Sequence, residues 1–174
     1  TFLSAFVCAW GSAMYLFRRS EKGDQLAVSA AELTVLFCLL TLVTGPLWAR
    51  KAWGVWWQWD VRLTTTLLLF MIFVAYLFAR KYGGPGSRKL AAGLALFGAA
   101  DVPLIYFSVS IWRTIHPKAT VISNIAKSRN GMGTPLLVGF ISFLCLFLAL
   151  LEMRMALERA RARVDELHIE VEDL

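Results

Sequence analysis

The stretch Thr134–Leu151 reads TPLLVGFISFLCLFLALL and contains no charged residue. A helix needs about 20 apolar residues to cross the hydrocarbon core of a bilayer, and this run approaches that length. A water-soluble domain could not bury several such segments, whereas a bilayer can. The stretch therefore predicts a transmembrane helix.

Four further apolar runs precede this one. Hydrophobic residues make up 58% of the 174 positions, and the mean hydropathy is +0.61. The sequence thus predicts an all-α fold, a polytopic membrane bundle with five spans over residues 1–151 and a charged helical tail over 152–174. Because Thr1 opens directly into an apolar run, we expect the first helix to be truncated and the complete protein to have six spans. The four runs are Thr1–Phe17, Gln25–Trp48, Leu63–Ala79 and Leu90–Trp112.

The basic residues between the spans indicate sidedness. The connections 18–24 and 80–89, together with the tail, hold 11 of the 18 Lys and Arg residues. This bias places them in the cytoplasm, so segments 49–62 and 113–133 share the outer face. The net charge of +6 is distributed in short clusters and forms no continuous stripe, which argues against a nucleic-acid partner.

A few residues interrupt the apolar pattern inside the spans. Glu32 lies near a cytoplasmic helix end, where its side chain can reach the interface, and for Asp101 we expect an interhelical hydrogen bond, with a functional role as the alternative. Cys8, Cys38 and Cys145 lie in apolar runs without metal-site spacing, and the chain has no Cys-x-x-Cys-His. We predict three buried, unreactive thiols.

The segment between the second and third spans is unusually rich in tryptophan. It reads Trp53-Gly54-Val55-Trp56-Trp57-Gln58-Trp59-Asp60. An interfacial aromatic belt explains one or two tryptophans, but not four within seven residues that end on an aspartate. If the segment is a short helix or turn along the interface, Trp53, Trp56 and Trp57 share one face, with Asp60 a turn further along.

Such a face suits a planar, mostly apolar ligand with charged edges. Arg50, Lys51 and Arg62 flank it and could meet acidic groups on that ligand. Heme fits this description, since its ring needs stacking surface and its propionates need cations. A quinone or a lipid headgroup fits less completely.

The string Trp-Gly-x-Trp-Trp-x-Trp-Asp at 53–60 resembles the signature of the WWD-domain heme-handling membrane proteins of c-type cytochrome biogenesis. The continuation Val61-Arg62-Leu63-Thr64 is similar to the CcmC branch (cytochrome c maturation protein C, or heme exporter protein C). The sister CcsA branch more usually continues with Pro-Lys-Glu. Residues 39–50, 102–109 and 112–117 also resemble the CcmC branch.

Only two histidines are present, and they lie on opposite sides of the membrane. His168 falls in the charged tail and is expected to be a solvated helix residue, whereas His116 falls in the outer loop that shares a face with the tryptophans. A neutral imidazole nitrogen is a common ligand of heme iron. The resemblance implies two axial histidines, of which His116 matches the second. The first would lie upstream of Thr1.

The resemblance implies that heme b binds at the periplasmic face of the bacterial inner membrane, with His116 as an axial iron ligand. Asp60 cannot stack on the ring, and we expect it to cap backbone amides or to contact a chaperone. The expected site residues around His116 are Arg50, Trp53, Trp56, Trp57, Trp59, Asp60, Arg62 and Arg113.

The family's function implies a carrier and not an enzyme, which passes heme to a periplasmic heme chaperone. The implied partners are ABC-type ATPase and permease subunits and a small single-span membrane protein. The chain lacks a Gly-x-x-x-x-Gly-Lys-Ser/Thr motif, so any ATPase is a separate chain. The alternative is a permease or scaffold subunit without its own heme site. For the tail we favour a solvated extension of the fifth span over a docking helix.

Overall fold

The computed structural model describes residues 1–84, 86–112, 116 and 133–172. These residues form helices and connecting turns without a β-strand, which confirms the predicted all-α membrane fold. Four helices, α2, α3, α4 and α6, are long and apolar enough to cross a membrane, and α1 is a shorter apolar helix. Their bounds are α1 Phe2–Arg18, α2 Glu21–Trp53, α3 Val61–Tyr82, α4 Ser87–Ile111 and α6 Gly133–Glu172.

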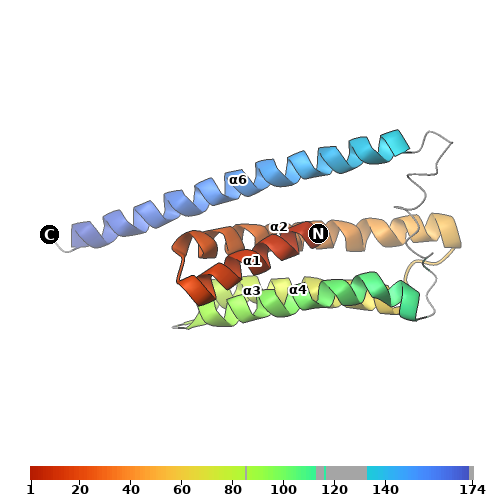
Figure 1. The fold of residues 1–174 in the computed structure, drawn as a ribbon, viewed down its shortest axis with the longest axis horizontal. Helices are drawn as coiled ribbons and strands as arrows, with labels where there is room; N and C mark the ends of the chain where they lie inside the picture. Colours follow the sequence, from red (N-terminus) through yellow and green to blue (C-terminus); the bar gives the residue numbers. More distant parts are fainter. Residues whose placement is uncertain (85, 113–115, 117–132, 173–174) are drawn as a thin grey trace.

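Helices α1 to α4 pack as a bundle, and α6 lies along α2 at one side (Figure 1). The contact between α1 and α2 is especially close. A β-carbon added to Gly11 would lie 2.6 Å from the backbone oxygen of Gly23, and one added to Gly23 would lie 2.9 Å from the oxygen of Gly11. Membrane helices associate through small residues of this kind, because lipid supplies no hydrophobic driving force between them.

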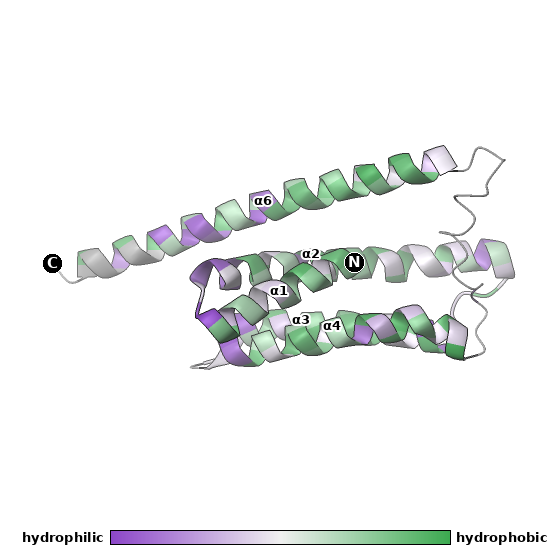
Figure 2. Ribbon diagram, in the orientation of Figure 1, coloured by the Kyte–Doolittle hydropathy of each residue, from purple (hydrophilic) through white to green (hydrophobic). Residues whose placement is uncertain are grey.

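Ion pairs connect the helices at one end of the bundle. Arg80 near the end of α3 donates to Asp24 in the first turn of α2 at 2.8 Å, and Arg88 in the first turn of α4 reaches Glu21 at 3.0 Å. Ser20 caps α2 by accepting a hydrogen bond from the Gly23 amide. Figure 2 shows hydrophilic residues gathered at this end. It is the end that the charge bias assigns to the cytoplasm.

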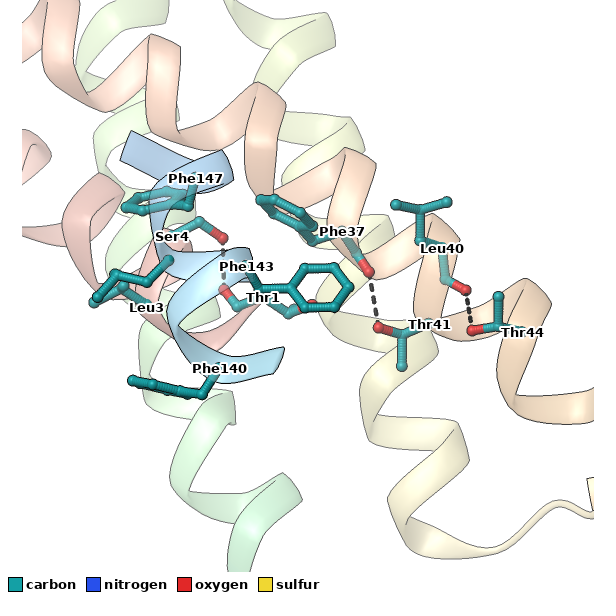
Figure 3. Close-up of a pocket in the computed structure, with 11 residues that line it drawn as sticks. Thr1, Leu3, Ser4, Phe37, Leu40, Thr41, Thr44, Phe140, Phe143 and Phe147 are labelled. Atoms are coloured by element: carbon teal, nitrogen blue, oxygen red, sulfur yellow. Dashed lines mark hydrogen bonds between the residues drawn. The ribbon is translucent and has the colours of Figure 1, made fainter. Parts of the chain in front are cut away.

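The long helix α6 packs loosely. A cleft of about 470 Å³ separates its first half from α1 and α2 (Figure 3), with Phe37, Phe140, Phe143 and Phe147 in its lining. Three hydroxyl groups in the cleft, those of Ser4, Thr41 and Thr44, donate to carbonyls of nearby residues in their own chain segment, as Thr41 does to Phe37 at 2.8 Å. The cleft therefore offers an apolar surface.

Three expectations about residues inside the spans need correction. Glu32 forms an ion pair with Arg154 of α6 and does not simply extend to the interface. Asp101 is 6% exposed, but its Oδ2 has no hydrogen-bond partner among the described residues, so the expected interhelical bond is missing at that oxygen. Cys8 and Cys38 are buried as expected, whereas Cys145 is exposed because only one side of α6 faces the bundle.

The close contact between α1 and α2 predicts a stability effect. In the Gly11→Ala variant the new methyl group meets backbone that cannot move aside, so the free energy of unfolding should fall by about 1–3 kcal/mol. Gly93 of α4 is the matched control, since nothing lies within 4 Å of a β-carbon added there. Thermal unfolding in detergent measures both variants. Equal stability of the Gly11→Ala and Gly93→Ala proteins would contradict the packing.

Candidate functional site at the tryptophan loop

The tryptophan-rich segment is a loop bounded by two helices. Helix α2 continues through Trp53, further than the sequence indicated, and ends at Gly54, whose φ of 77° and ψ of 1° are left-handed. Glycine adopts this conformation without steric cost and commonly ends helices. The nonhelical connection, which we call the tryptophan loop, is therefore Gly54–Asp60, within the predicted segment 49–62.

The expected helical face of tryptophans is wrong in its geometry, because the backbone is not helical beyond Trp53. The loop nevertheless brings Trp53, Trp56 and Trp57 to one cavity of about 130 Å³, and His116 lines the same cavity. Ligand pockets that enclose a small molecule are larger, about 300–1,000 Å³. This hollow is therefore too small to enclose a ligand of that size.

The aromatic rings of the site meet edge to face. Trp53 contacts Trp48 of α2 at a centroid distance of 4.8 Å and the His116 ring at 5.3 Å, while Trp57 contacts Trp59 at 5.5 Å. Edge-to-face contact is a favoured aromatic geometry. It holds the inner rings in place and leaves Trp56 and Trp59 54% and 75% exposed. The loop thus presents large apolar surfaces to its surroundings.

Asp60 joins the loop to both neighbouring parts of the site. Its Oδ1 accepts a hydrogen bond from the Leu63 amide at 2.8 Å, which caps α3, and its Oδ2 lies 2.7 Å from Nδ1 of His116. The two side chains are only 8% and 19% exposed. The amide cap is the bond expected from the sequence, whereas the contact with His116, 56 residues away, was not predicted.

The contact with Asp60 determines which nitrogen of the His116 ring carries the hydrogen. An ionised carboxylate only accepts hydrogen bonds, so Nδ1 must bear the hydrogen. In the neutral ring the lone pair is then on Nε2, which is the atom that would bind a metal. Metal-binding histidines usually donate their other nitrogen to a carboxylate or carbonyl in this way. This preference of metal-binding histidines, together with the predicted location of both segments on one face, is the signal from which the Asp60–His116 contact could have been predicted.

The family model described as CcmC, heme exporter protein C, matches residues 2–170. This chain belongs to the CcmC family. The resemblance seen in the sequence is therefore confirmed.

Relatives of the chain share its sequence over most of its length. It is 38% identical to heme exporter protein C of Bradyrhizobium diazoefficiens, covering 96% of the chain and 66% of the relative. It is 36% identical to heme exporter protein C of Escherichia coli strain K12, over 84% and 62%. A putative ccmC-like mitochondrial protein of Arabidopsis thaliana is 38% identical, over 71% and 48%. The chain thus spans about half to two thirds of these relatives.

Of the three arginines predicted around the site, two lie among the described residues. Arg50 donates from Nη1 to the Gly54 carbonyl at 3.0 Å and places its guanidinium 5.7 Å from the centre of the Trp56 ring. It therefore braces the loop. Arg62 is half-buried in the first turn of α3. Arg113 lies outside the described residues.

The brace predicts a change in loop dynamics. The Arg50→Gln variant loses the cation over Trp56 and weakens the bond to Gly54, so amides 54–60 should exchange hydrogen faster, by roughly fivefold for about 1 kcal/mol of lost contact. Lys51→Gln removes the adjacent exposed cation and serves as the control. Hydrogen-exchange mass spectrometry of the purified protein reports both. Unchanged exchange in Arg50→Gln would show that the loop does not depend on this residue.

Proposed function

We propose that this chain binds heme b at the periplasmic face of the bacterial inner membrane and delivers it to a periplasmic heme chaperone for maturation of c-type cytochromes. The observation that carries this proposal is the Asp60–His116 pair beside a tryptophan-lined cavity. Membership of the CcmC family and the name of its relatives, heme exporter protein C, support the same ligand.

His116 supplies the iron ligand in this proposal. Asp60 accepts the Nδ1 hydrogen and so directs the Nε2 lone pair outward from the carboxylate. The hydrogen bond also restricts rotation of the ring. Asp60 is therefore a positioning residue. A second axial histidine is the partner that the family resemblance implies.

The tryptophans supply apolar surface for the porphyrin. Trp53 and Trp57 line the hollow beside His116, while Trp56 and Trp59 offer exposed rings. Because the hollow is small, heme would be covered on one side and remain accessible on the other. Such partial coverage suits a carrier, which must release its ligand to another protein.

In this proposal, cations beside the loop form ion pairs with the propionates of the heme. The Arg50 guanidinium has five N–H groups and uses one of them on Gly54, so others can meet a carboxylate. Arg62 and Arg113 are the further candidates. A half-covered heme would leave its charged edge near water, where such pairs orient the ligand more than they stabilise it.

The chain acts in this proposal as a carrier and not as an enzyme. It would work with ABC-type ATPase and permease subunits and with a small single-span membrane protein. ATP hydrolysis, where it is coupled to heme release, takes place in a separate subunit.

The His116→Ala variant tests the proposed heme ligand. Purified with its biogenesis partners, the unmutated full-length protein should show a Soret band, and the variant should lose or shift it. Its heme affinity should fall by at least the roughly 10- to 100-fold seen when a ligand's hydrogen-bond partner is lost. His168→Ala is the control, because His168 is exposed on α6. A heme-free unmutated protein, or equal spectra for the two variants, would contradict the proposal.

A further inference from the structure

The C-terminal half of α6 is a second surface of interest, far from the tryptophan loop. Helix α6 continues without a break from the apolar run Thr134–Leu151 to Glu172. It extends beyond the turn that joins α1 and α2, and its C-terminal end lies at the opposite end of the molecule from the tryptophan loop (Figure 1). The span is complete near Leu151, so the rest of the helix leaves the membrane on the side assigned to the cytoplasm.

Two opposite faces of this segment have different surroundings. The inner face follows Leu151 and Met155, which pack against the bundle, and the half-buried Ala162 lies further along the same face. The opposite face carries a row of exposed residues, which we call the outer stripe. With 3.6 residues per turn, the two rows lie on opposite sides of the helix. The outer stripe consists of Met153 (69% exposed), Leu157 (40%), Ala160, Val164 (54%), Leu167 (59%) and Val171 (70%).

The spacing of the outer stripe is that of a coiled coil. Its members recur at alternating intervals of four and three residues over the whole segment. A strict repeat of this kind, 3.5 residues on average, is the seam by which two helices wrap around each other. The a positions are then Leu157, Val164 and Val171, and the d positions are Met153, Ala160 and Leu167. Valine at a with leucine at d, as in the last part of the stripe, is the combination that favours two parallel strands. A solitary solvated helix would be polar on all sides.

The residues beside the stripe select the kind of partner. Arg161 and Arg163 occupy flanking e and g positions, where coiled-coil partners exchange charges, and the next e and g positions hold His168 and Glu170. Arg161 pairs with Glu158 of its own helix at 2.7 Å, yet its side chain stays 58% exposed. At the membrane end, Arg154 is paired with Glu32.

A second copy of this chain fits the flanks poorly. In a parallel pair of identical helices, Arg163 of one copy would face His168 of the other, and Ala156 would face Arg161. Neither pair joins opposite charges. A membrane surface fits poorly as well, since interfacial helices lie in the membrane plane, whereas this segment continues the axis of a spanning helix.

We propose that the outer stripe docks an amphipathic helix of a different protein chain on the cytoplasmic side. That helix carries apolar residues at the same alternating spacing and acidic residues opposite Arg161 and Arg163. It packs parallel to α6 as a two-stranded coiled coil. The surface does not depend on the heme site, so either proposal can fail without the other.

Site-specific photocrosslinking of the full-length protein in native membranes, with its neighbouring subunits co-expressed, tests the docking surface. A photoreactive residue at Val164 should give an adduct with a different polypeptide. The crosslinked peptide should show the three-and-four apolar spacing with Asp or Glu beside it. The same probe at Arg159, exposed but off the stripe, should give little adduct.

Charge reversal tests the proposed flanks. The double variant Arg161→Glu and Arg163→Glu should lower the yield of the Val164 adduct by about fivefold, as expected for two exposed ion pairs. Replacing the partner's acidic flanks by Lys should restore it. An unchanged melting temperature shows that the variant is folded. The proposal is overturned by an adduct of two copies of this chain, by adducts with lipid alone, or by equal yields from positions 164 and 159.

Discussion

The site depends on the double hydrogen bonding of one carboxylate. Asp60 is nearly buried, and a buried carboxylate is tolerated only where hydrogen bonds satisfy its oxygens. One oxygen caps the first turn of α3 and the other holds His116. The start of a spanning helix and the orientation of the imidazole are therefore fixed by the same group. A change at Asp60 affects both, which ties the loop to the membrane bundle.

The bundle in turn fixes where the tryptophan loop lies. Close packing of glycine and alanine between α1 and α2, and the Asp24–Arg80 pair at the other end, set how the long helices are placed. Gly54 ends α2, and Asp60 begins α3 six residues later. Because the connection is short, the tryptophans pack against one another and against the imidazole. The helices thus present a compact aromatic surface at the end of the bundle opposite the Asp24–Arg80 pair.

Much of this architecture could be predicted from the sequence, because apolar length decides a spanning helix almost by itself. The five helices lie where the apolar runs do, and the motif at 53–60 identified the family. One of the failed expectations was local, and two others depended on contacts between distant residues. Helical spacing suggested a shared tryptophan face, but Gly54 ends the helix and the rings meet through the loop. Glu32 forms an ion pair with a residue of α6, and Cys145 is exposed because α6 packs loosely. No local pattern encodes such pairings.

The most direct measurement is heme affinity in the Asp60→Ser variant, measured together with hydrogen exchange at the start of α3. Serine keeps a good helix cap, but its single short hydroxyl cannot also reach His116. We predict unchanged protection of the first α3 amides and a loss of heme affinity of about 10- to 100-fold, with a smaller loss in Asp60→Asn, which keeps the shape. Heme binding by Asp60→Ser with unmutated affinity and Soret position would contradict the account.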